Sequence, residues 1–133
     1  YSKDYDFSFS GLKTAVLYFL KKQKKEFIKK FRKDICASFQ QAIIDVLIKK
    51  TIRAAKEYKV KSIILGGGVA ANKELRKQFR KQIKKEIPAT KYSIPATNFC
   101  TDNGAMVAAT AFFYQKEATK NWQGIKANAN LKI

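Results

Sequence analysis

Three consecutive glycines, Gly66 to Gly68, separate a short apolar run at 62–65 from a stretch with helical spacing that begins at Asn72. A strand, a glycine turn and a helix N-terminus together present unpaired backbone N–H groups and the positive end of a helix dipole, which favour a phosphate or carboxylate. Glycines also let a ligand approach the backbone closely. The pattern therefore predicts an anion site, and a tight turn without a ligand is the structural alternative.

Two nucleotide-binding motifs are close to this pattern without fitting it. Gly66, Gly68 and Ala71 match G-x-G-x-x-A, and Glu86 follows at about the spacing of a ribose-binding acid. Glu86 falls at the end of the following helix, however, whereas the fingerprint requires the acid at the C-terminal edge of the next strand. The Lys-Ser/Thr pair of a Walker A loop is also missing.

A second candidate for chemistry is "CTDNGAM", residues 100–106, which places Asp102 and Asn103 at the predicted start of a helix. The Asp102 carboxylate can either cap that helix or be held outward as a metal ligand. The chain contains no histidine, so any imidazole ligand must come from another segment or another chain.

The charge balance indicates a polyanionic partner. The chain has 28 Lys and Arg against 10 Asp and Glu, a net charge of +18. A compositional preference for lysine on solvated helix faces is the alternative. We favour nucleic acid over a membrane surface, because the predicted helices pack into a core and do not carry Trp and Phe along one face. Affinity for nucleic acid should then fall steeply with salt. The basic residues are expected on the outer surface of two helices, at 21–33 and at 73–85, the latter with Lys73, Arg76, Lys77, Arg80, Lys81, Lys84 and Lys85.

The first 60 residues predict two helices. Helical spacing runs from Gly11 to about Lys30, with Ser8 or Ser10 placed to cap the helix. The pattern breaks near 32–34. A long core helix then continues to about Tyr58, with its apolar positions at Ile35, Phe39, Ala42, Ile43, Val46 and Leu47.

Residues 61–120 predict strand, helix, strand and helix, and 121–133 a polar tail. The strands end at the glycines and at Pro95, and the last helix is expected to start with Thr101 as its cap and to pack closely through small residues. The sequence thus predicts one helix-rich α/β domain. It lacks the roughly 18-residue apolar run of a membrane span, and its separated cysteines, Cys36 and Cys100, favour reduced thiols in the cytoplasm. The start at Tyr1 suggests a fragment.

Four blocks in order resemble the C-terminal half of the tRNA N6-adenosine threonylcarbamoyltransferase family. The blocks are "DFSFSGLKTAV" (6–16), "DICASFQQAIIDVL" (34–47), "IILGGGVAANKELR" (63–76) and "IPATNFCTDNGAMVAATAFF" (94–113). The resemblance implies the second lobe of an actin-like ATPase fold with ribonuclease H-like topology. It further implies that Asn72, Gly67 and Gly68 contact the bound adenylate. Asp102 would be one ligand of a divalent metal, iron or zinc, whose His-x-x-x-His ligands lie in the N-terminal half.

The implied reaction transfers the threonylcarbamoyl group from threonylcarbamoyl-AMP to N6 of the adenosine 3′ of the anticodon in tRNAs that read codons beginning with A. The implied partners are tRNA, an inactive paralogous subunit and a small ATPase subunit. We expect Lys77, Lys81 and Lys84 to contact tRNA, and the isolated chain to be inactive and able to self-associate through its uncovered apolar face. The alternatives are a basic, non-catalytic nucleic-acid or scaffold module, or an ATPase lobe of the same superfamily.

Overall fold

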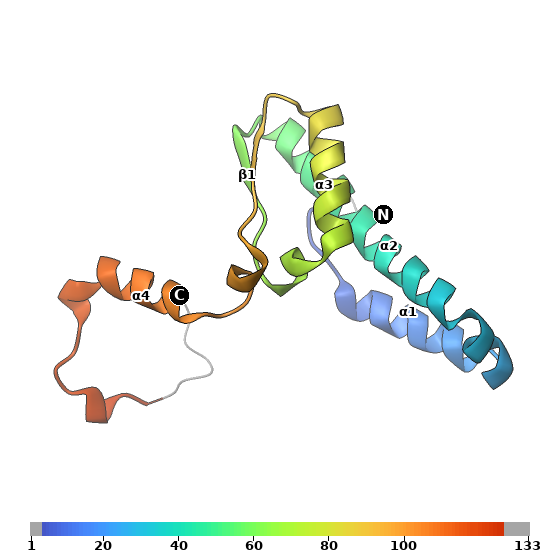
Figure 1. Cartoon of the computed structure of the whole chain (residues 1–133), viewed down its shortest axis with the longest axis horizontal. Coiled ribbons are helices and arrows are strands. Elements are labelled where there is room, and N and C mark those ends of the chain that lie inside the picture. The colour runs from blue at the N-terminus through green and yellow to red at the C-terminus, as the bar shows by residue number, and fades with distance from the viewer. Residues whose placement is uncertain (1–3, 127–133) are drawn as a thin grey trace. The chain divides into compact units, whose positions relative to one another are not determined.

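The structure is a computed structural model that describes residues 4–126 (Figure 1). It divides into two compact units, residues 1–100 and 101–133, which are described separately. The elements of the first unit are α1 (Phe9–Lys21), α2 (Lys25–Glu57), β1 (Ser62–Ile64), the 3-10 helix η1 (Gly68–Ala71), α3 (Lys73–Glu86), β2 (Lys91–Ser93) and η2 (Thr97–Phe99). Those of the second unit are α4 (Gly104–Phe113), η3 (Gln115–Glu117) and η4 (Trp122–Gly124).

Helix α1 begins where the sequence predicts and ends earlier. Of the two candidate caps, Ser8 is the one used: its Oγ accepts a hydrogen bond from the Gly11 N–H at 3.4 Å. The helix ends at Lys21, because the run from Lys21 to Lys24 has no apolar side chain to hold another turn. The break predicted near 32–34 corresponds to a kink one residue earlier, at Phe31, whose φ and ψ of −104° and 16° are not helical; α2 continues on both sides of it.

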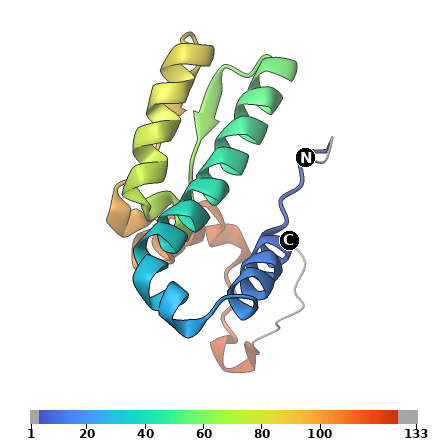
Figure 2. The same cartoon turned by 90° about the vertical axis from the view of Figure 1, so that its right-hand side faces the viewer.

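The buried face of α2 differs from the predicted one. Ile44, Ile48, Ile52 and Ala55 are buried, at spacings of three and four, and they pack in the same core as residues of β1 and α3. The positions predicted as core, from Ile35 to Leu47, are half-buried or exposed. Three of them, Ile35, Phe39 and Ala42, line a groove between α2 and α1, which runs alongside the first half of α2 (Figure 2).

A parallel strand pair joined by α3 forms the centre of the first unit. Ser62, Ile63 and Ile64 pair with Lys91, Tyr92 and Ser93 in register. Parallel strands need a crossover connection, and α3 provides it while packing on α2. The core combines Ile63 with Leu75, Phe79 and Ile83 of α3, and the Phe79 ring stacks on Tyr92 at a centroid distance of 5.8 Å.

The segment before α1 is fastened to α2 through a buried lysine. Lys50 is 8% exposed and pairs with the Asp4 carboxylate at 3.2 Å. Its ammonium also donates to the Asp6 carbonyl and lies 5.5 Å from the centre of the Phe7 ring. An ammonium is costly to bury unless such partners compensate its lost hydration, so Lys50 fixes the position from which α1 starts.

The second unit is built around an apolar helix that carries no charge. Asn103, not the predicted Thr101, caps α4: its Oδ1 accepts from the Met106 N–H at 3.1 Å. Close packing is not observed, because no residue of α4 is buried in the described structure. Among the described residues, no helix has the length and apolar character needed to cross a bilayer. Of the predicted tail, residues 127–133 lie outside the described part of the chain.

Candidate functional site

The glycine turn connects the end of β1 to the start of α3. The last bond of the strand pair runs from the Leu65 N–H to the Ser93 carbonyl at 3.0 Å, and the chain then turns at Gly67, whose φ and ψ are 81° and 169°. That conformation is confined almost entirely to glycine. The 3-10 helix η1 follows directly, and Asn72 leads into α3. The strand, turn and helix therefore meet as the sequence predicts.

The turn carries backbone donors without acceptors and consists of exposed residues. Within the described residues, the N–H groups of Gly66, Gly67, Gly68 and Val69 donate no hydrogen bond. A methyl group built on Gly66 or Gly67 would have no atom within 4 Å. Successive N–H groups at such a turn form an anion-binding concavity. The described chain leaves room there for a ligand phosphate.

Asn72 has two roles inside the chain. Its Oδ1 caps α3 by accepting from the Leu75 N–H at 2.9 Å, and its Nδ2 donates to Gln40 Oε1 at 2.9 Å. A side-chain amide nitrogen carries two N–H donors, so a second donor stays available for a ligand. A small pocket beside Asn72 is lined by Gln40, Phe39, Ile43 and other residues of α2, η1 and α3. Sequence reasoning missed Gln40, because nothing distinguishes it from the other polar residues of a long helix.

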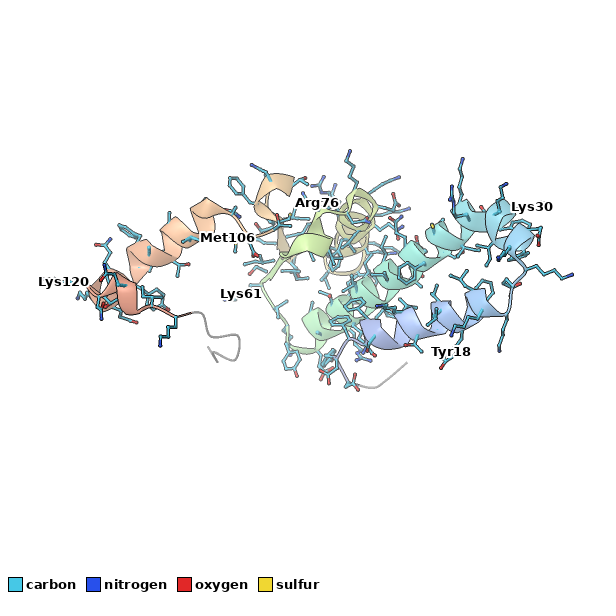
Figure 3. All side chains as sticks on the ribbon, turned by 90° about the horizontal axis from the view of Figure 1, so that it is seen from below. Tyr18, Lys30, Lys61, Arg76, Met106 and Lys120 are labelled. Atoms are coloured by element: carbon cyan, nitrogen blue, oxygen red, sulfur yellow. The ribbon has the colours of Figure 1, made fainter. Side chains whose placement is uncertain are left out.

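Arg76 does not belong to the outer surface of α3, where the sequence placed it. It is half-buried, and its guanidinium donates from Nε to the Ala70 carbonyl at 2.5 Å and from Nη2 to the Pro95 carbonyl at 2.8 Å. Nη2 also lies 2.9 Å from Cys100 Sγ. Figure 3 labels Arg76 on its helix. The sequence offered no signal for this, since Arg76 is one of many basic residues on α3.

The three lysines expected to contact tRNA share one exposed face. Lys77, Lys81 and Lys84 are exposed and line a shallow groove on α3. The other residues that line this groove are Lys73, Arg76 and Arg80. No acidic residue lines it, so the groove concentrates positive charge along one side of α3. Such a surface suits a phosphate backbone.

Glu86 is too far from the turn to bind a ribose there. It ends α3, a helix of 14 residues that is about 20 Å long at 1.5 Å per residue. Its carboxylate accepts a hydrogen bond from Lys56, which together with the attraction of that ammonium lowers the pKa of Glu86. Gly66, Gly68, Ala71 and Glu86 therefore do not form a dinucleotide-binding site of the G-x-G-x-x-A type.

Asp102 is exposed and is not a helix cap. It lies just before Asn103, and its carboxylate makes no hydrogen bond or ion pair within the described residues. A shallow groove along α4 starts at Asp102 and Asn103. The described residues contain no group of three or more potential metal ligands, and the sequence has no histidine. In the described part of the chain, Asp102 is thus available as one ligand and has no cluster of further ligands around it.

Comparison with known proteins decides the family. A sequence model of the tRNA N6-adenosine threonylcarbamoyltransferase family matches residues 1–109. The chain belongs to this family. A threonylcarbamoyltransferase of Thermosipho africanus is 48% identical over 132 residues, 99% of this chain and 39% of that protein. One from Geobacillus thermodenitrificans is 42% identical over 129 residues, 97% of this chain and 37% of its own length.

Membership in the threonylcarbamoyltransferase family confirms the predicted fold class. The structure is helix-rich α/β with a small parallel sheet, and the family has the actin-like ATPase fold. A third relative, from Thermosipho melanesiensis, is 52% identical over 111 residues, 84% of this chain and 32% of that protein. The chain spans less than two fifths of the length of these three transferases. The names of these relatives connect the family to tRNA modification by a transferase.

Proposed function

We propose that this chain supplies the adenylate-binding turn and a tRNA-contacting face to an enzyme that forms threonylcarbamoyladenosine in tRNA. The donor is threonylcarbamoyl-AMP, and the acceptor is N6 of the adenosine 3′ of the anticodon in tRNAs that read codons beginning with A. One observation carries the proposal: in a member of this family, four successive N–H groups at 66–69 have no acceptor among the described residues and belong to exposed residues, and a Cβ at Gly66 or Gly67 would meet open space.

The turn has a direct role in the proposed reaction. The N6 amine attacks the carbamoyl carbon, a new C–N bond forms, and the bond from that carbon to the phosphate oxygen breaks. AMP leaves with the electron pair, and the amine loses a proton to solvent or a base. Backbone donors aimed at the phosphate stabilise the negative charge that grows on AMP. The second N–H of Asn72 and the backbone of Gly67 and Gly68 would hold the substrate beside it.

Asp102 would contribute one ligand to the metal of the whole enzyme. The metal, iron or zinc, would polarise the carbamoyl oxygen or the phosphate when bound. Its remaining ligands would come from outside this chain, as the His-x-x-x-His pair of the family implies. We therefore propose that the 133 residues alone do not catalyse the transfer.

The proposal extends to partners and compartment. The family resemblance implies tRNA, an inactive paralogous subunit and a small ATPase subunit as partners. The two free cysteines, exposed Cys36 and buried Cys100, support a reducing compartment such as the cytoplasm. The basic groove on α3 supports tRNA as the polyanion.

A methyl group at Gly66 should weaken adenylate binding without weakening the fold. Gly66 has no positive φ and open space in front of it, so Gly66→Ala should change the free energy of unfolding by less than about 1 kcal/mol. The methyl group occupies the space that the phosphate would enter. We expect the KM for threonylcarbamoyl-AMP of the full-length enzyme to rise about tenfold, measured by nucleoside mass spectrometry of tRNA. Gly104→Ala, which also meets open space, is the matched control, and an unchanged KM in Gly66→Ala would contradict a phosphate at this turn.

Charge reversal on the basic face of α3 should weaken tRNA binding. The triple variant is Lys77→Glu/Lys81→Glu/Lys84→Glu. A plot of log affinity against log salt falls with salt, and each lost phosphate contact should make its slope less steep by about 1. Affinity for tRNA is measured by fluorescence anisotropy at several salt concentrations. The control reverses three exposed lysines of the second unit, Lys116, Lys120 and Lys126. Equal slopes in the two variants would mean that the lysines of α3 do not contact tRNA and reflect only a preference for lysine on solvated helix faces.

A further inference from the structure

Arg76 connects the glycine turn and η1 to the segment 94–100. In the described structure, no other hydrogen bond links these two segments. The strands stay bonded up to Leu65 and Ser93, and the chains then diverge into the glycine turn and the segment 94–100. Across that gap, the described hydrogen bonds run through Arg76 to the Ala70, Pro95 and Cys100 acceptors.

Both ends of this bridge are short turns closed by hydrogen bonds. Ala70 is 1% exposed and lies in η1, whose backbone is closed by bonds from Ala70 to Gly67 and from Asn72 to Val69. On the other side, Cys100 is buried, its N–H donates to Thr97, and its Sγ lies 3.6 Å from the Ala96 carbonyl. A guanidinium between two such short turns fixes their separation.

The three acceptors require the shape of arginine. The guanidinium is a planar fork with five N–H donors in fixed directions, so Nε and Nη2 can serve acceptors on two sides at once. A lysine ammonium is a compact point charge on a flexible stem and cannot reproduce this geometry. The nearby exposed residues Lys73, Lys77 and Arg80 make no such bonds in the described structure.

We propose that Arg76 is a positioning residue that holds η1, and with it the N–H groups at 66–69, in the orientation that receives the phosphate of the adenylate. This inference rests on the proposed function. Arg76 contacts neither substrate nor reacting atoms in this proposal; it acts through the Ala70 carbonyl. Misplacing donors by about 1 Å costs on the order of 100-fold in rate, so the bridge matters for binding the adenylate even though it lies behind the turn.

The test compares Arg76→Met and Arg76→Lys with Lys85→Met in the full-length enzyme. Lys85 is exposed at the far end of the same helix, so its loss removes the same charge without touching the turn. We expect Arg76→Met to raise the KM for threonylcarbamoyl-AMP about 10-fold to 100-fold, far more than the KM for tRNA, to which Arg76 contributes only one of the six basic side chains that line the groove on α3. Arg76→Lys keeps the positive charge but should show a similar rise in the KM for threonylcarbamoyl-AMP. A variant that only loses folded protein would lower Vmax with both KM values unchanged, and that result would overturn the proposal.

Hydrogen exchange separates this proposal from the proposed function. In the full-length protein, the Ala70 and Asn72 amides, which close η1, should exchange about tenfold faster in Arg76→Met than in wild type or Lys85→Met. Unchanged exchange would overturn the positioning role whatever the activity. If wild type neither binds AMP nor modifies tRNA, the proposed function fails, and faster exchange in Arg76→Met would still support Arg76 as the residue that holds the turn.

Discussion

Replacing Asp102 with alanine in the full-length enzyme is expected to lower threonylcarbamoyl transfer by about 1,000-fold. A metal ion contributes several kcal/mol to stabilising a transition state, and each 1.36 kcal/mol is about tenfold in rate. The Asp102 carboxylate is exposed and makes no hydrogen bond or ion pair in the described chain, so its removal should leave the local fold intact. Nucleoside mass spectrometry of tRNA measures the transfer, and elemental analysis of the purified protein measures bound iron or zinc.

Asn103→Ala is the matched control for Asp102→Ala. It removes the cap of α4, whose loss costs about 1 kcal/mol of helix stability, and it keeps the carboxylate. We expect this variant to retain its metal and most of its activity. If Asp102→Ala keeps both metal and activity, Asp102 is not a ligand. If the two variants lose activity equally and both keep their metal, the effect belongs to the start of α4 rather than to a metal.

Phe79→Ala should have the largest effect on stability. The Phe79 side chain is 1% exposed, stacks on Tyr92 and lies in the core between α2, α3 and β1. Truncation of a buried phenylalanine costs about 3–5 kcal/mol through lost burial and the cavity that remains. This is a large share of the roughly 5–15 kcal/mol that stabilises a typical domain. Urea denaturation of the 133-residue chain, followed by far-ultraviolet circular dichroism, gives the free energy of unfolding.

Phe113→Ala makes the same change on an exposed residue. Phe113 is 81% exposed at the end of α4, so this substitution should change the free energy of unfolding by less than about 0.5 kcal/mol. Similar losses in the two variants would place Phe113 in a buried environment. A small loss in Phe79→Ala would mean that the βα core contributes little to the stability of the chain.

The sequence was most informative around the glycine turn, where local chemistry decides the structure. A β-branched run, three glycines and an asparagine cap leave few alternatives, and the structure has a strand, a turn with positive φ at Gly67 and a helix capped by Asn72 there. The exposed lysines of α3 were also foreseeable, because a polar face at helical spacing is solvated whatever the tertiary packing.

The features that could not be predicted from the sequence depend mainly on contacts between residues far apart in the chain. The apolar positions of α2 cover more than one face, so periodicity alone could not select Ile44, Ile48 and Ile52 as the buried set. Lys50 and Arg76 look like the other basic residues until partners distant in sequence surround them. The cap of α4 was missed by two residues, because Thr101, Asp102 and Asn103 are all good capping residues.

The parallel pair of β1 and β2 leaves each strand paired on one side in the described chain. Unpaired strand edges attract further strands, so this chain alone would tend to associate edge to edge. Its charge of +18 opposes that contact through repulsion between copies. Salt screens this repulsion at separations beyond a Debye length, which is about 10 Å at 0.1 M. We therefore expect the salt that would weaken the proposed contact with a phosphate backbone to favour contacts between copies as well, and low salt to keep the free chain dispersed.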